Sequence, residues 1–238
     1  MKKIAFLYAC LLLLAGCGRS LPVVKGEGQV LSKERKLPAY TQIKLECGAD
    51  IVLTHGQVGD ITINASQNME PYVITEVKDG VLIVRMSPDF AYQFIKKLEI
   101  CIPVDDSLTE VTVQGSGDIN SHEQLQVKNL SCKVLGSGDM LLSLQAESLS
   151  FSVKGSGDMK IKGTAQTLAV AIAGSGDFDG DALQTKQATA SIRGSGDVDL
   201  FVTEQLSADI RGSGDITVKG NPKKIDVQTK GSGRVRYL

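Results

Sequence analysis

Apolar and polar residues alternate strictly in short segments throughout the second half of the chain. Every second position is apolar in the segments 149–153, 168–172 and 206–210. This period of two is typical of a β-strand with one buried face. A shorter apolar alternation follows each segment, as at Met159 and Ile161. We therefore expect two strands in each unit, both buried on one side.

One tetrapeptide, Gly-Ser-Gly-Asp, separates the two strands of every unit. It occurs six times, and a seventh copy ends in arginine (Gly231-Ser232-Gly233-Arg234), at intervals of 18 to 21 residues. A repeat of this length predicts a solenoid in which corresponding strands stack in parallel. We predict an all-β parallel β-helix, or β-solenoid, with coils of about 19 residues and an irregular N-terminal cap. The predicted structural turn residues are Gly115, Gly117, Gly136, Gly138, Gly155, Gly157, Gly174, Gly176, Gly194, Gly196, Gly212 and Gly214.

Residues 37–106 are less regular. Cys47-Gly48-Ala49-Asp50 occupies a turn position between apolar segments and predicts a degenerate first coil. Lys78-Asp79-Gly80 separates residues 73–77 from 81–86, and Asp-Gly is typical of a tight hairpin turn. We expect 37–106 to form the N-terminal cap and first coil, in one domain with the regular coils of 107–238.

The N-terminal residues predict export. Lys2 and Lys3 precede an apolar run over residues 4–14, which is too short to span a bilayer. Leu14-Ala15-Gly16-Cys17 resembles the bacterial lipobox, which implies cleavage after residue 16 and lipid attachment to Cys17. We predict a lipoprotein signal peptide at 1–16 and a lipidated tether at 17–36. The alternative is an ordinary signal peptide in which Cys17 has no role. The expected location is the bacterial cell envelope, at the outer membrane, with the lipid as the membrane contact.

Composition narrows the candidate functions. The net charge of −1 gives no electrostatic basis for binding nucleic acid. Three cysteines follow the signal region, Cys47, Cys101 and Cys132, and an odd number argues against a complete disulfide framework. Cys132 falls in the buried register and is interpreted as a small core residue. His55 and His122 lack ligand-spaced partners, so neither a zinc site nor a histidine-based catalytic triad is predicted. We expect no cofactor and no enzymatic activity.

The Gly-Ser-Gly-Asp repeats, the degenerate first coil and the segment Thr75-Glu76-Val77-Lys78-Asp79-Gly80-Val81-Leu82 resemble the putative auto-transporter adhesin head GIN domain family. The resemblance extends over about residues 39–238 and implies an exported protein or lipoprotein, notably of Bacteroidetes. It carries over no catalytic or ligand residues. We do not expect the membrane barrel of an autotransporter, since nothing in the sequence after Leu238 could form one.

The repeated aspartates are the candidate ligand-facing residues. We expect Asp118, Asp139, Asp158, Asp177, Asp197 and Asp215 to line one edge of the solenoid. One hypothesis is structural: each carboxylate accepts backbone hydrogen bonds within its own turn, the glycines adopt left-handed angles, and Lys154, Arg193, Arg211 and Lys230 offset the charge. The other hypothesis is a row of calcium sites, although the second ligand that such repeats supply is present only at Asp179, Asp181 and Asp199.

We expect a non-enzymatic envelope lipoprotein that acts as an adhesion, binding or structural surface module. Its partner would be a glycan or another envelope protein. The alternatives are a polysaccharide-active β-helix enzyme and a calcium-binding repeat protein. The chain has no tryptophan and 5% aromatic residues, so it offers few platforms for stacking sugars in an active site.

Overall fold

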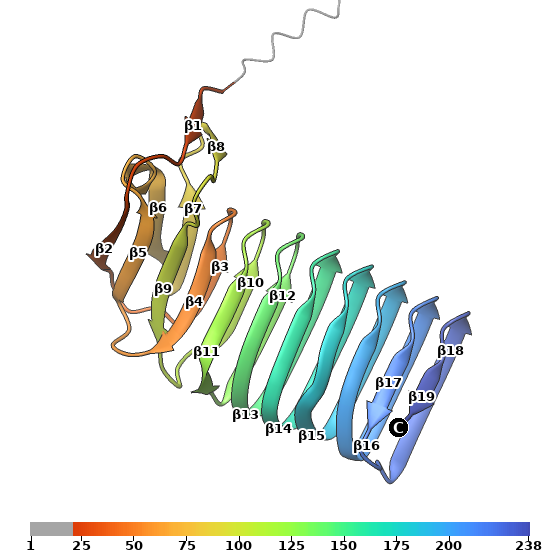
Figure 1. Ribbon diagram of the computed structural model, residues 1–238. Coiled ribbons are helices and arrows are strands. Elements are labelled where there is room, and N and C mark those ends of the chain that lie inside the picture. The colour runs from red at the N-terminus through yellow and green to blue at the C-terminus, as the bar shows by residue number, and fades with distance from the viewer. Residues whose placement is uncertain (1–20) are drawn as a thin grey trace, which may run out of the picture.

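The computed structural model describes residues 21–238 as a β-solenoid whose coils stack in a row (Figure 1). Its most regular part consists of four long strands, β13 (Met140–Gly155), β14 (Met159–Gly174), β15 (Phe178–Gly194) and β16 (Val198–Gly212). Neighbouring strands pair in parallel, and β13 and β14 stay in register from Met140↔Met159 to Gly155↔Gly174. The predicted parallel solenoid is confirmed.

Each long strand joins two segments that the sequence pattern predicts separately. In β13, Met140 and Leu142 are buried in the first half, and Phe151 and Val153 are buried in the second half. Both halves contribute to one hydrophobic core. The Gly-Ser-Gly-Asp turns therefore separate one long strand from the next, and the connection between the two halves remains within the strand.

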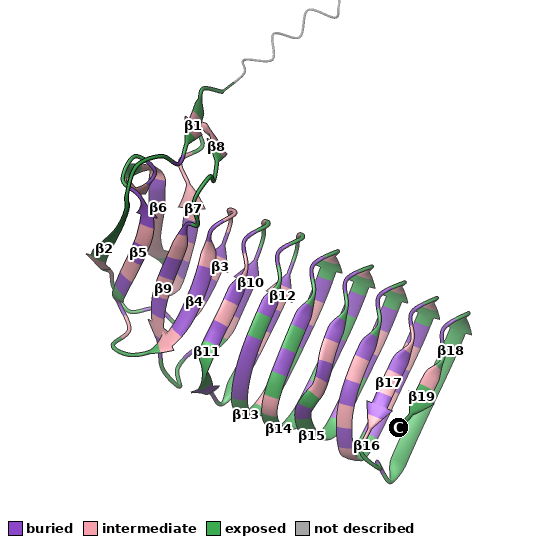
Figure 2. Cartoon of the chain, viewed as in Figure 1, coloured by how far each residue is buried: buried purple, intermediate pink, exposed green. Residues whose placement is uncertain are grey.

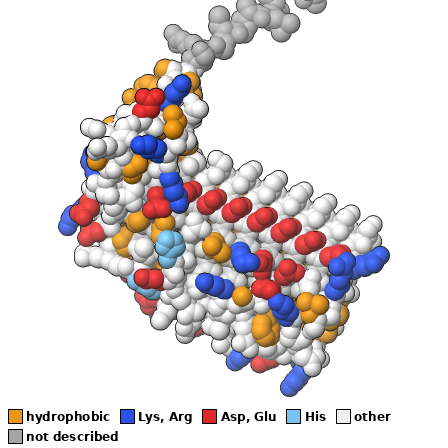
Figure 3. All heavy atoms as spheres, viewed as in Figure 1, with side chains coloured by type: hydrophobic (Ala, Val, Ile, Leu, Met, Phe, Trp, Pro, Cys, Tyr) orange, Lys and Arg blue, Asp and Glu red, His pale blue; other side chains and the backbone are white. Residues whose placement is uncertain are grey.

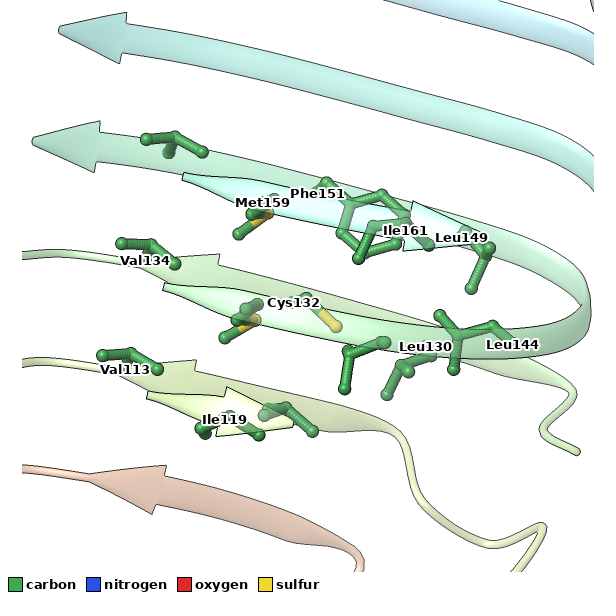
Figure 4. Packing of buried hydrophobic residues seen from close by; sticks show 14 of the residues in the cluster. Val113, Ile119, Leu130, Cys132, Val134, Leu144, Leu149, Phe151, Met159 and Ile161 are labelled. Atoms are coloured by element: carbon green, nitrogen blue, oxygen red, sulfur yellow. The ribbon is translucent and has the colours of Figure 1, made fainter. Parts of the chain in front are cut away.

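The core runs through the coils as one continuous cluster (Figure 4). Equivalent residues of successive coils stack, as Phe151 does on Val170. The ring centroids of Phe151 and Phe178, which belong to different rows, lie 5.1 Å apart. Cys132 is fully buried beside this row and pairs in register with Phe151, which confirms its interpretation as a core residue. Burial stabilises such rows by about 25 cal/mol for each Å² of apolar surface removed from water.

Shorter strands complete the coils at both ends of this central region. On the N-terminal side lie β10 (Glu110–Val113), β11 (Ile119–Gln126) and β12 (Asn129–Val134). On the C-terminal side lie β17 (Ile216–Lys219), β18 (Lys224–Gly231) and β19 (Val235–Tyr237). Strands β18 and β19 pair in parallel with β16 and β17 and form the last coil.

The degenerate turn at Cys47–Asp50 lies between β3 (Gln42–Leu45) and β4 (Asp50–His55). These strands pair in parallel with β10 and β11, so they form a coil, as predicted. The predicted hairpin is also confirmed: β6 (Val73–Lys78) and β7 (Val81–Met86) are antiparallel, with positive φ at Asp79 (50°) and Gly80 (76°).

A further coil, which is not among the predicted ones, lies on the outer side of β3 and β4. Strand β7 pairs in parallel with β3, and β9 (Glu99–Val104) pairs in parallel with β4. Strands β7 and β9 therefore lie on one side of the coil formed by β3 and β4. The chain then crosses to the other side of that coil, where β10 begins. No Gly-Ser-Gly-Asp motif marks this coil, because a longer segment containing β8 (Ala91–Gln93) connects its two strands.

The N-terminal end is covered by antiparallel strands and by a short 3₁₀-helix, η1 (Glu70–Tyr72). Strand β5 (Asp60–Ser66) pairs with β9, and β2 (Val30–Lys36) pairs with β5 along its whole length. Strand β1 (Val23–Lys25) pairs with β8. The prediction of a tether up to residue 36 is therefore wrong for β1 and β2. Most residues of β2 are exposed, so the strand has no apolar alternation by which it could be predicted.

Within residues 21–238 there is no helix of the length and apolar character needed to cross a membrane.

Candidate functional site

The Gly-Ser-Gly-Asp turns stack along one edge of the solenoid, where their aspartates form a continuous acidic row (Figure 3). The serine side of each turn is exposed, as at Ser156 and Ser175. Backbone hydrogen bonds connect successive turns: the Ser175 N–H donates to the Gly155 carbonyl at 3.0 Å. The predicted turn residues are therefore brought together, coil after coil.

Both glycines of each motif lie close to the coil before them, since a Cβ on either would be within 2.7 Å of a carbonyl oxygen there, but their backbone angles differ. The first has positive φ in four of the predicted turns, 147° at Gly155, 151° at Gly174, 143° at Gly194 and 149° at Gly212. The second glycine does not, and the expectation of left-handed angles is wrong there. A Cβ on Gly176 would lie 2.1 Å from the Gly157 carbonyl oxygen. The second glycine thus allows the backbones of adjacent coils to approach each other closely.

The aspartates bind the next coil and not their own turn. Oδ1 of Asp118 accepts the backbone N–H of Asp139 at 2.9 Å, and Oδ1 of Asp158 accepts that of Asp177 at 2.8 Å. The same bond continues through the row. The acceptors are Oδ1 of Asp139, Asp177 and Asp197, and the donors are the backbone N–H groups of Asp158, Asp197 and Asp215, respectively. This corrects the expected hydrogen bonding within each turn. The carboxylates form a ladder that fastens each coil to its successor.

The ladder has an extra rung at its beginning and a different residue at its end. Oδ1 of Asp50 accepts the Asp118 N–H at 3.3 Å, so Asp50 belongs to the ladder although it is not among the predicted ladder residues. Its place in the degenerate turn was the signal that could have identified it. At the other end, Arg234 donates its N–H to Asp215 Oδ1 at 2.8 Å. Arg234 thus takes the position of an aspartate in the last described coil.

Among residues 21–238, cations form ion pairs with the ladder only at its two ends. Asp50 Oδ2 lies 3.3 Å from Lys97 Nζ, and Asp215 Oδ2 lies 2.7 Å from Arg236 Nη2. Arg211 instead pairs with Asp209. Within the described residues, none of the four cations expected to offset the ladder (Lys154, Arg193, Arg211 and Lys230) forms an ion pair with it. In each inner aspartate, Oδ1 accepts the N–H of the next coil, and Asp139, Asp158, Asp177 and Asp197 are exposed.

An open groove of about 490 Å³ runs beside the C-terminal half of the ladder. Ladder residues form one side, and Asp179 and Asp199 add a second acidic row. Lys160 binds Asp179 at 2.5 Å, and this carboxylate raises the pKa of the lysine. Lys219 pairs with Asp181, which lowers the pKa of that carboxyl group. The groove is strongly acidic but partly neutralised on its second row.

A second, polar groove of about 280 Å³ lies on the outer surface of the coils. Its polar side chains carry hydroxyl and amide groups in two parallel rows: Ser148, Thr167, Gln187 and Gln205 stand in register, and Ser150, Thr189 and Ser207 form the next row, which Ala169 interrupts. Leu149, Leu168 and Ala188 lie between the two rows. Hydroxyl and amide groups can both donate and accept hydrogen bonds. The surface repeats the same chemistry along the stacking direction.

The described residues hold no group of three or more histidine, cysteine, aspartate or glutamate side chains placed to bind a metal ion. His55 lies 3.0 Å from the Gln124 carbonyl oxygen through its Nε2 atom. Burial raises the thiol pKa values of Cys47, Cys101 and Cys132. All three cysteines are free. Cys17 lies outside the described residues.

The comparisons with known proteins agree with this architecture. Residues 39–222 match the model of the family described as putative auto-transporter adhesin, head GIN domain. The chain belongs to this family. No curated protein matches it significantly.

Similar solved structures extend over nearly the whole chain. A putative adhesin from Bacteroides fragilis is 27% identical, with a TM-score of 0.85 over 90% of this chain and 100% of the other. A putative adhesin from Parabacteroides distasonis is 25% identical, with a TM-score of 0.70 over 91% and 100%. A protein from the same organism, described as a putative lipid binding protein, shares the fold at 24% identity and a TM-score of 0.75, over 91% of this chain and 99% of the other.

Proposed function

We propose that this protein is a non-enzymatic lipoprotein of the bacterial envelope whose solenoid acts as an adhesion-like binding module at the outer membrane. Membership of the adhesin head family supports a surface or envelope role. The lipobox-like Leu14-Ala15-Gly16-Cys17 supports the lipid anchor. The solenoid would then present its rows of side chains to material outside the membrane.

The observation that carries the binding role is the polar groove. Its hydroxyl and amide side chains repeat in register on β13, β14, β15 and β16. An extended partner with a repeating structure can make the same hydrogen bonds on several coils, and many weak contacts then add up. A glycan chain has this character, and its hydroxyl groups match those of Ser150, Thr167 and Thr189.

A screen of the protein against bacterial and host glycans tests this proposal. We expect binding that falls at least about tenfold in Thr167→Arg/Thr189→Arg, because two bulky cations would fill the groove. The matched control is Lys160→Ala/Thr217→Ala on the acidic side of the molecule, which should bind normally. Retention by no glycan, or equal binding by both variants, would contradict a glycan-binding groove.

The same screen with and without calcium tests the second reading of the ladder. We expect calcium at millimolar concentration to change neither binding nor the midpoint of thermal unfolding appreciably, since Oδ1 of each ladder aspartate already accepts a backbone hydrogen bond. A calcium-dependent rise in Tm that disappears in Asp139→Asn/Asp158→Asn/Asp177→Asn would show that the ladder binds metal.

A further inference from the structure

The last described coil leaves one side of the sheet unpaired. Strand β18 pairs with β16 and β19 pairs with β17, and neither has a second neighbour within residues 21–238. All eight residues of β18 are exposed (Figure 2). In an inner coil the Gly212 carbonyl accepts the N–H groups of Ser232 and Gly233, whereas Gly231 receives no such bond from a described residue. Unpaired edges of this kind can accept another strand.

Apolar side chains that are buried in other coils are exposed in this one. Ile225 and Val227 stand in register with Leu206 and Ala208, which are buried. Ile225 nevertheless remains 49% exposed and Val227 37% exposed, and Tyr237 on β19 is 51% exposed. At the opposite end, β2 and β5 lie over the coil formed by β7 and β9. The C-terminal coil has no equivalent cover among the described residues.

This coil also carries a strong excess of positive charge. Residues 220–238 contain Lys223, Lys224, Lys230, Arg234 and Arg236 but only one acidic residue, Asp226. Within the described residues only Arg236 of these five cations forms an ion pair, with Asp215 of the preceding coil at 2.7 Å. Two copies that met through this coil would bring like charges together, which disfavours end-to-end pairing of the protein with itself.

The Arg236–Asp215 pair shows how a carboxylate on one coil meets a cation on the next. Arg234 occupies the position of the ladder aspartate in this coil. An added strand would therefore lie beside a guanidinium group where the inner coils have an acceptor carboxylate. A strand with acidic side chains complements this guanidinium and the neighbouring lysines, and its apolar side chains can cover Ile225 and Val227. The backbone N–H and C=O groups of this added strand would pair with the unpaired backbone groups of β18.

We infer that the C-terminal coil is a docking surface for an acidic, extended segment of a partner polypeptide, which adds to β18 as a β-strand. The inference names one partner for the binding module proposed above, but it concerns a different surface from the polar groove. Backbone pairing supplies the geometry, and the cations select the charge of the partner.

The test uses the full chain carrying Cys17→Ser and a labelled peptide of about ten residues in which valine and glutamate alternate. We expect saturable binding by fluorescence anisotropy that weakens as salt increases. A valine–lysine peptide should not bind. A valine–glutamate peptide with two central prolines should bind at least about tenfold more weakly, because proline lacks the N–H needed for strand pairing.

Matched variants locate the site. Lys224→Glu/Lys230→Glu should weaken binding at least about tenfold. The control, Lys154→Glu/Arg193→Glu, makes the same charge change on inner coils, and both residues occupy the register position of Lys230. It should leave affinity within about twofold. Circular dichroism and thermal unfolding of each variant verify that the fold is retained.

Several results would overturn the inference: no peptide binding, equal loss in both variant pairs, or equal binding of the proline peptide. Association of the protein with itself through this coil in analytical ultracentrifugation would assign the edge to a second copy. Binding to phosphatidylglycerol vesicles in place of the peptide would assign it to a lipid surface. The assay contains no glycan or envelope material, so failure of the glycan screen leaves its result unchanged.

Discussion

At the scale of single residues, each turn combines a steric requirement with a directional bond. The second glycine leaves room for the carbonyl group of the coil before it, and the aspartate reaches the N–H of the coil after it. Arg234 fits this scheme, because its backbone N–H donates the last described ladder bond, to Asp215 Oδ1.

Gly176→Ala tests the steric requirement. The new Cβ would lie 2.1 Å from the Gly157 carbonyl oxygen and 2.9 Å from Val153 Cγ1, so the coils must move apart. We expect the free energy of unfolding in urea to fall by about 1 to 3 kcal/mol. Ser175→Ala is the control: its side chain is exposed, and the loss should stay within about 0.5 kcal/mol. Equal, small effects of both substitutions would contradict the close approach of the backbones.

Asp158→Asn and Asp158→Ala separate the roles of charge and hydrogen bonding in the ladder. The amide oxygen of asparagine can still accept the Asp177 N–H, whereas alanine leaves this donor to water. We expect Asp158→Asn to lower the free energy of unfolding by no more than about 1 kcal/mol and Asp158→Ala to cost more. Urea titrations of the two variants give the comparison. If asparagine destabilised the protein as much as alanine, the charge itself would be needed.

At the scale of elements, strand β2 illustrates how an exposed strand is fixed. Arg35 Nη1 donates to the Val73 carbonyl at 2.7 Å and to Thr75 Oγ1 at 3.0 Å, and its Nη2 binds Glu70 Oε1 at 2.5 Å. One side chain thereby connects β2 to η1 and β6. Desolvation raises the pKa of Glu70, but the hydrogen bonds from Arg35 and Lys33 outweigh it, and the net pKa is lowered.

Arg35→Ala should therefore loosen the N-terminal cap. We expect a loss of about 1 to 2 kcal/mol at neutral pH and faster hydrogen exchange of the β2 amides. Because the folded-state pKa of Glu70 is lowered, its ion pairing stabilises the protein above the ordinary carboxyl pKa and is lost as the pH falls through the lowered value. The difference in the free energy of unfolding between the wild-type protein and Arg35→Ala should therefore become smaller at acid pH. Lys33→Ala removes a cation whose own side chain is largely exposed and should cost less than about 0.5 kcal/mol. An equal loss there would refute the assignment to Arg35.

At the scale of the whole molecule, the solenoid extends away from the end where the described chain begins (Figure 1). The C-terminal coil lies at the opposite end of the stack from β2 and β5. If lipid is attached at Cys17, the capped end is nearest to the membrane and the open coil is farthest along the stack from the anchor. The proposed peptide-docking surface would then be accessible to partners.

Cys17→Ser tests this arrangement. Removing the thiol removes the attachment point for the acyl chains, each of which contributes about 0.8 kcal/mol per buried methylene to membrane binding. We expect the variant in the soluble fraction and the wild-type protein in the membrane fraction after a high-salt wash. Cys132→Ser serves as a control because Cys132 is buried in the core, and it should remain in the membrane fraction. A Cys17→Ser protein that still sediments with membranes would disprove lipid anchoring at this residue.

The sequence by itself determined the parallel solenoid, its period and the edge on which the aspartates lie. These features repeat, so each strand and turn is specified several times, and the apolar alternation that places Phe151 or Cys132 in the core is local. The β6–β7 hairpin was equally predictable, because Asp79 and Gly80 provide the backbone angles of the turn.

Only the tertiary structure decided how the coils are fastened and how the ends are built. The bond from Asp158 to Asp177 joins residues of different turns, and nothing in one turn specifies it. Strand β2 lacks a buried face and is held by pairing with β5 and by Arg35. The coil of β7 and β9 lies out of chain order beside β3 and β4. In each case the interaction that decides the structure connects segments distant in sequence, so a local sequence pattern cannot predict it.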